Sequence, residues 1–140
     1  MASFTNMATL SYNGSQINSN VVTGELQDAL TVTKTAVSGS YRPGDTVTYV
    51  VTLTNTGTAL TGQEGAVITD TFEPTLTITG VTFNGAAWTS PEDYTYDAAT
   101  GAFATVAGKL TVPEATFTQN ADGSWTVTPG QSILTVTGTV

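Results

Sequence analysis

Residues 46–55 read TVTYVVTLTN and decide the fold class. Apolar side chains stand at every second position from Val47 to Leu53, and threonines fill most of the positions between them. A period of two residues is typical of a β-strand with one buried face and one exposed face. The stretch therefore predicts a core strand whose buried face comprises Val47, Tyr49, Val51 and Leu53.

Shorter stretches with the same alternation lie on both sides of this strand, and Gly, Pro, Asn and Asp clusters separate them. The expected strands cover residues 4–12, 17–26, 30–36, 66–72, 76–83, 110–112, 116–118, 125–128 and 133–140, with a possible short hairpin within residues 88–107. No segment repeats with the 3.6-residue period of a helix. Many short strands with frequent turns predict an all-β fold, an antiparallel β-sandwich, and favour it over a barrel because the strand lengths are uneven.

Composition excludes several classes of function. Only 10% of the residues are charged, against about 25% in ordinary soluble domains, and threonine is the commonest residue. The net charge is −8, and the three basic residues, Lys34, Arg42 and Lys109, lie far apart in the sequence. Because no phosphate-binding patch can be assembled from them, we expect neither nucleic acid nor an anionic membrane surface as a partner.

The chain contains no cysteine and no histidine. It therefore lacks a disulfide framework, thiolate chemistry, the commonest general base and the commonest transition-metal ligand. No apolar run approaches the roughly 18 residues of a membrane-spanning helix, and residues 1–10 lack the basic and apolar regions of a signal peptide. We expect no enzymatic activity, no catalytic residue, no cofactor and no metal site.

One acidic loop offers an alternative that points to a ligand. Glu92, Asp93 and Asp97 stand close to the aromatic residues Trp88, Tyr94 and Tyr96. Paired carboxylates beside stacking aromatics are typical of sugar sites, and three carboxylates could also hold calcium. Since the spacing matches no established calcium loop, a solvated loop with packed aromatics is the favoured interpretation.

The first 26 residues form a unit of their own. Phe4, Ala8, Leu10 and Tyr12 fall on one face of an alternating stretch, and Asn13-Gly14 then gives a strong hairpin turn. The second arm, residues 17–26, carries Ile17 and Val21. A two-stranded hairpin is marginally stable alone, so this one is expected to dock on another surface.

A family resemblance appears from residue 30 onward. The stretch LTVTKTAVSGSYRPGDTVTYVVTLTNTGTA, residues 30–59, resembles the start of the DUF11 repeat of bacterial cell-surface proteins, and VITDTFEPTL, residues 67–76, is similar to the next landmark of that repeat. The resemblance implies an immunoglobulin-like sandwich without enzymatic activity, on large surface or appendage proteins.

The chain departs from that pattern at its two ends. The repeat usually closes with strands similar to NMATLSY and SNVVT, which stand here at residues 6–12 and 19–23. We therefore expect residues 1–26 to be a donor hairpin and residues 27–140 a sandwich with an open edge and a groove. The donor residues would be Phe4, Ala8, Leu10, Tyr12, Ile17 and Val21, and the acceptor residues Val47, Tyr49, Val51, Leu53, Leu134 and Val136.

Donation of this hairpin to another copy would join subunits head to tail into a homo-oligomeric filament. Two alternatives stay open. The hairpin could close on its own chain, giving a circularly permuted monomer with an adhesive or carbohydrate-binding role, or it could be a loose tail. The resemblance and the threonine-rich composition point to an extracellular location, on a cell or spore surface appendage.

One charged pair falls on core faces. Lys34 and Asp70 each stand on the apolar face of an expected strand. A buried charge needs a partner, so the pair predicts an ion pair or, by analogy with surface fibres of Gram-positive bacteria, an isopeptide bond.

Overall fold

The computed structural model describes residues 2–26, 29–37 and 39–140, with the backbone alone for residues 2–4 and 25–26. Within these residues the chain forms antiparallel β-strands and no helix. The strands are β1 (Ala2–Asn6), β2 (Thr9–Tyr12), β3 (Ser15–Asn18), β4 (Val22–Leu26), β5 (Leu30–Ala36), β6 (Thr46–Asn55), β7 (Thr69–Thr71), β8 (Thr77–Phe83), β9 (Ala86–Ala87), β10 (Tyr94–Asp97), β11 (Ala102–Thr105), β12 (Thr116–Gln119), β13 (Trp125–Thr128) and β14 (Gly130–Thr139).

Two sheets enclose the core. The larger has the order β5-β6-β14-β8-β9, and the smaller has the order β10-β11-β7. Apolar side chains from both sheets meet in one cluster, which includes Val51, Leu53, Phe103, Leu134 and Val136. This all-β arrangement is consistent with a β-sandwich.

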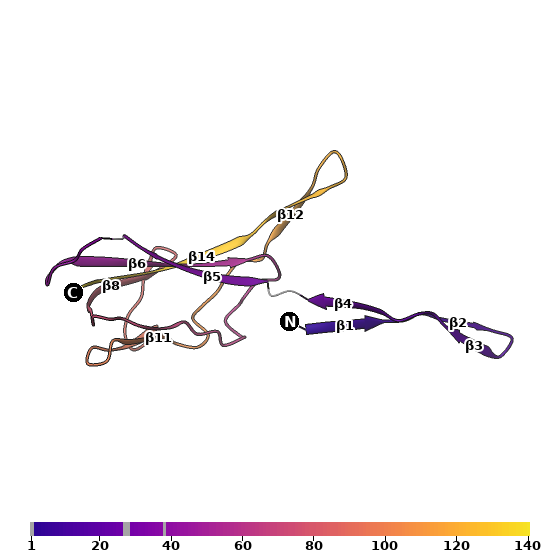
Figure 1. Cartoon of the computed structure of the whole chain (residues 1–140), viewed down its shortest axis with the longest axis horizontal. Helices are drawn as coiled ribbons and strands as arrows, with labels where there is room; N and C mark the ends of the chain where they lie inside the picture. The colour runs from indigo at the N-terminus through magenta and orange to yellow at the C-terminus, as the bar shows by residue number, and fades with distance from the viewer. Residues whose placement is uncertain (1, 27–28, 38) are drawn as a thin grey trace.

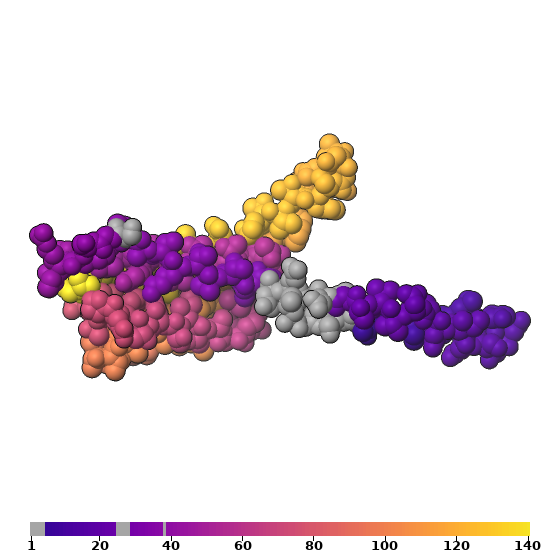
Figure 2. Space-filling model, viewed as in Figure 1, coloured from indigo at the N-terminus to yellow at the C-terminus, as the bar shows by residue number. Residues whose placement is uncertain are grey.

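The register of the larger sheet defines two ends of the sandwich. Leu30 and Gly130 both pair with Asn55 at what we call the near end. Thr46 pairs with Thr139 at the opposite, far end. The N-terminal hairpin and the β12–β13 hairpin both project on the side of the near end (Figures 1 and 2).

The turn chemistry follows from the sequence. Asn13 and Gly14 both have positive φ, as do Asn84 and Gly85 between β8 and β9. Both pairs therefore have the backbone signs of a type I′ turn, whose twist matches that of the strands it joins. The Asn13-Gly14 turn joins β2 to β3 as expected.

Several expected elements differ from those observed. The strand expected at residues 4–12 is divided into β1 and β2, and the one expected at residues 17–26 into β3 and β4. The strand expected at residues 66–72 is confined to β7, because the Ile68 N–H donates to the side chain of Thr105 at 2.9 Å and not to a strand backbone. Residues 110–112 contribute only an isolated bridge between Val112 and Leu60. The last strand begins earlier, at Gly130. The possible hairpin within residues 88–107 is present as β10 and β11.

Candidate strand-acceptor groove

Both sheets have an unpaired edge on the same side of the sandwich. On β5, the carbonyl of Ala29 accepts the Thr56 N–H at 2.9 Å. Because inward and outward hydrogen bonding alternates along an antiparallel strand, Leu30, Val32 and Lys34 direct their backbone groups away from β6. Their side chains share a face with core residues, since Val32 pairs with Leu53.

The smaller sheet ends at β7 by the same reasoning. The Phe72 N–H donates to Gly101, and the Ile68 carbonyl accepts from Thr105, each at 2.9 Å. Asp70 lies between them in the alternation, so Thr69 directs its backbone groups away from β11. On this side of the sandwich, the free edges therefore belong to β5 and β7.

A groove of about 400 Å³ lies between these edges. Its lining is mainly apolar and comprises Leu30, Thr31, Val32, Leu53, Leu60, Ala66, Val67, Ile68, Thr69, Leu110 and Val112. Val32 is 61% exposed and Leu30 is 43% exposed, although both side chains are on the inward face of β5. Apolar side chains on an inward face are normally covered by a neighbouring strand, so this edge leaves an apolar face of the described residues uncovered.

The predicted acceptor residues divide into three groups. Leu53 lines the groove. Val47, Val51, Leu134 and Val136 are buried under other parts of the sandwich, and Tyr49 is half-buried beneath Lys34. The prediction missed Leu30, Val32, Leu60, Ile68 and Leu110. The alternation of residues 30–36 marked Leu30 and Val32 as inward-facing, but a pattern of one strand cannot reveal which sheet edge is open.

Lys34 and Asp70 close the groove toward the far end. The Lys34 Nζ forms an ion pair with Asp70 Oδ2 and lies 4.4 Å from the ring centre of Tyr49 and 5.1 Å from that of Phe72. Asp70 Oδ1 also accepts the Thr71 N–H at 2.8 Å. The structure thus brings together the two residues that the sequence paired, and it describes them as an ion pair.

The N-terminal hairpin is a ribbon of two paired segments. β1 pairs with β4, β2 pairs with β3, and the Ser19 N–H donates to the Ala8 carbonyl at 2.8 Å between them. Within the described residues, these four strands pair only with one another. The ribbon extends away from the sandwich (Figure 1).

The apolar side chains of this ribbon are uncovered. Leu10 pairs directly with Ile17, and they are 61% and 51% exposed. Ala8, Tyr12 and Val21 are also exposed, whereas the side chain of Phe4 lies outside the described residues. Because cross-strand partners and alternate residues share a face, Ala8, Leu10, Tyr12 and Ile17 form one apolar face, called here the donor face.

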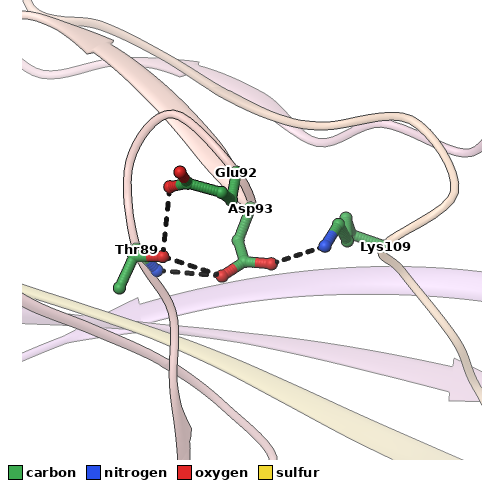
Figure 3. A network of polar contacts seen from close by, with 4 residues as sticks. All are labelled: Thr89, Glu92, Asp93 and Lys109. Atoms are coloured by element: carbon green, nitrogen blue, oxygen red, sulfur yellow. Dashed lines mark hydrogen bonds and ion pairs between the residues drawn. The ribbon is translucent and has the colours of Figure 1, made fainter.

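The acidic loop has a different arrangement (Figure 3). Asp93 accepts the Thr89 N–H at 2.9 Å and pairs with Lys109 Nζ at 2.9 Å, and Glu92 accepts from the Thr89 hydroxyl at 3.3 Å. The Thr89 N–H, followed by Lys109, lowers the pKa of Asp93. Asp97 instead accepts the Ala99 N–H at 2.9 Å.

The aromatic residues near this loop pack within the protein. Trp88 stacks on Phe83 with ring centres 4.8 Å apart, and Tyr94 stacks on Phe103 at 5.3 Å. The Tyr96 hydroxyl donates to the Leu76 carbonyl at 2.8 Å. The rings thus contribute to the core, in line with the favoured interpretation of this loop.

The described residues contain no group of three or more acidic, histidine or cysteine side chains that could hold a metal ion. In the same part of the chain, no helix has the length and apolar character needed to cross a bilayer.

No protein-family model, curated protein or solved structure matches the chain.

Proposed function

We propose that this chain is a structural subunit that assembles head to tail by donor-strand complementation into an extracellular filament. One observation carries the proposal: a single chain has both an uncovered apolar ribbon and an unfilled apolar groove between two free sheet edges. Each needs what the other supplies. The ribbon offers strand backbone and apolar side chains, and the groove offers open backbone groups and an apolar floor.

Energetics favour filling the groove. A two-stranded ribbon is marginal in water by itself. Full burial of a large apolar side chain contributes about 1.5–3 kcal/mol, so Leu10 and Ile17 together would stabilise a docked ribbon substantially. Open backbone groups of Leu30, Val32 and Thr69 would gain partners at the same time.

The lengths of the two elements agree. β5 has seven residues and is about 23 Å long at ~3.3 Å per residue, and the arm from Asn6 to Tyr12 has the same number of residues. A ribbon that crosses over the partly exposed Lys34–Asp70 ion pair from the far end would bring Leu10 and Tyr12 to the apolar groove. Its polar middle, near Ser19 and Asn20, would then lie over that ion pair.

Such a contact is heterologous, because one copy contributes its ribbon and the other contributes its groove, which are different surfaces. Heterologous contacts propagate into filaments when the rotation between copies does not close a ring. The DUF11 resemblance of residues 30–59 and 67–76 supports an immunoglobulin-like topology for the acceptor domain and a location on a cell or spore surface appendage. No catalytic step, cofactor, nucleic acid or membrane insertion is part of the proposal.

Two full-length variants test the exchange. Leu10→Asp puts a charge on the donor face and leaves the groove intact, and Val32→Asp puts a charge in the groove and leaves the ribbon intact. Each variant alone should stay monomeric. Their equimolar mixture should form a dimer, since one intact ribbon and one intact groove remain. Size-exclusion chromatography with light scattering measures both results.

Matched controls stand one residue away on the opposite faces. Ser11→Asp and Thr33→Asp should assemble like the unaltered chain, which negative-stain microscopy should show as filaments. A full chain that stays monomeric at high concentration would overturn the proposal. So would a monomeric mixture of the two variants, and an unaltered monomer with a protected ribbon would favour closure on the same chain.

A further inference from the structure

The β12–β13 hairpin is a second projection with an uncovered apolar face. Phe117 pairs directly with Val127, and Trp125 lies two residues before Val127 on the same side. All three side chains are exposed, Trp125 to 61%. The other side of the hairpin is formed by threonines. An apolar cluster of this kind on a projecting element is typical of an interaction surface.

The base of this hairpin is firmly anchored to the sandwich. The Asn55 side chain is fully buried and donates to the carbonyls of Thr58 and Pro113 at 2.6 and 3.1 Å. The Ala115 N–H donates to Gly57 at 3.0 Å. At Gly130, a Cβ atom would lie 1.9 Å from the Pro113 carbonyl, so the two backbones are in close contact. The hairpin is therefore held in a defined direction.

The hairpin projects from the same end of the sandwich as the N-terminal ribbon, the near end (Figures 1 and 2). In the proposed assembly the ribbon enters from the far end of the copy that receives it, so that far end lies next to this near end. This inference rests on the proposed function.

The far end of the sandwich carries exposed apolar side chains and a basic residue. Val37 is 79% exposed, and Tyr41 is also exposed while its hydroxyl donates to the Val37 carbonyl. The turn that follows is joined to the C-terminal strand, because the Gly44 N–H donates to Val140 at 2.6 Å. Next to Tyr41, Arg42 is the one basic residue that forms no ion pair within the described part of the chain.

We propose that the apolar face of the β12–β13 hairpin, formed by Phe117, Trp125 and Val127, packs against Val37 and Tyr41 at the far end of the next copy. Asp122, in the turn at the hairpin tip, has the charge opposite to that of Arg42. An exposed ion pair adds little energy, so the apolar contact supplies affinity and the charges set orientation. Each junction then has two contacts, and the second restrains bending between subunits.

The dimer formed by the Leu10→Asp and Val32→Asp chains isolates one junction. The Val32→Asp chain gives its ribbon and its β12–β13 hairpin, and the Leu10→Asp chain gives its groove and its far end. Phe117→Thr with Trp125→Thr in the ribbon-giving chain should weaken the dimer about tenfold or more, as expected when two exposed aromatics lose their contact. Val37→Thr with Tyr41→Thr in the other chain should weaken it similarly. Isothermal titration calorimetry measures both.

Controls separate this contact from the first one. Thr116→Ser and Thr118→Ser, on the polar face, should leave the affinity unchanged. Asp122→Arg in the ribbon-giving chain and Arg42→Asp in the other should each weaken the dimer several-fold, and together restore it, as a double-mutant cycle detects. Filaments of the Phe117→Thr, Trp125→Thr chain should still form but bend more in negative-stain images.

Three results would overturn the inference. The first is an unchanged dimer affinity after the aromatic substitutions. The second is a loss on changing Phe117 and Trp125 without a loss on changing Val37 and Tyr41, because the hairpin would then contact another surface. The third is an unchanged dimer affinity in both the Asp122→Arg and the Arg42→Asp single variants. If the Leu10→Asp and Val32→Asp chains, without further substitutions, form no dimer, the proposed function is contradicted instead.

Discussion

Lys34 Nζ on the edge strand β5 contacts Asp70 Oδ2 on the edge strand β7, so one ion pair bridges the open edges of both sheets. The side chains are 39% and 24% exposed. The ammonium group also lies over the rings of Tyr49 and Phe72. This bridge separates the apolar groove from the far end and holds the two sheets together where no strand does so.

Asp70→Ala should therefore destabilise the sandwich modestly. The pair is partly exposed, so removing the carboxylate should lower the free energy of unfolding by about 1 kcal/mol. Lys34→Met leaves the Asp70 carboxylate without its partner, so it should lower the free energy of unfolding by a similar amount, although the methionine side chain still covers Tyr49. Urea denaturation measures both variants. Equal stability of Asp70→Ala and the unaltered chain, at low salt, would show that the bridge contributes nothing.

The same pair should remain non-covalent. An isopeptide bond between Lys34 and Asp70 would release one water, whereas the structure describes an ion pair between the two side chains. Intact-mass spectrometry should give the full calculated mass. A mass that is lower by one water in the unaltered chain, but not in Lys34→Met, would establish the crosslink instead.

The Asp93–Lys109 pair should make the stability of the fold depend on pH in the acidic range. The Thr89 N–H and, after it, Lys109 hold the pKa of Asp93 below its ordinary value of 3.8. A lowered folded-state pKa stabilises the fold above 3.8, and this stabilisation disappears as the pH falls through the folded-state value.

Comparison with Asp93→Asn tests this sign. The unaltered chain should be more stable than the variant at neutral pH, and the difference should shrink in acid below the same 3.8. Denaturant titrations at several pH values give the difference. A gap that stays constant down to strongly acidic pH would contradict the assignment.

Gly130 should not accept a side chain. A Cβ there would lie 1.9 Å from the Pro113 carbonyl and 2.9 Å from that of Glu114, so Gly130→Ala must force two backbones apart. We expect a loss of about 2–3 kcal/mol, typical of overpacking against backbone. Gly80→Ala is the control, since nothing lies within 4 Å of its added methyl. Thermal unfolding should separate the two, and similar midpoints would refute the close approach.

Alternation predicted much of the fold because it depends on short-range geometry. The strand at residues 46–55 is β6, and the strand at residues 30–36 is β5, with the expected bounds. The turn at Asn13-Gly14 also follows from local chemistry, since an Asn-Gly pair accepts positive φ at little cost. Lys34 and Asp70 could be paired because each is a charge on an inward face.

Long-range placement could not be predicted in the same way. Leu134 and Val32 have the same alternating pattern, yet Leu134 is fully buried and Val32 borders the groove. The difference arises from the order of strands in the sheet, which puts β14 in the middle and β5 at an edge. Asn55 was another omission, because a polar residue at a strand end gives no sign that its side chain will anchor a distant loop through Pro113.

A designed cysteine pair should report directly on strand exchange. The chain has no cysteine, so Leu10→Cys with Val32→Cys introduces its only two thiols, and disulfides between residue 10 of one copy and residue 32 of the next would link the copies in series. A disulfide requires Cα atoms within about 7 Å, so it forms only where the donor face reaches the groove. Under mild oxidation the double variant should give a ladder of covalent multimers on non-reducing gels, and reduction should abolish it. Leu10→Cys with Thr33→Cys, on the outer face of β5, should give no ladder. A faster-migrating crosslinked monomer would mean that the ribbon closes on its own chain. If a cysteine at each of the positions from Leu10 to Tyr12, paired with Val32→Cys, gives no crosslink, docking in the groove is contradicted.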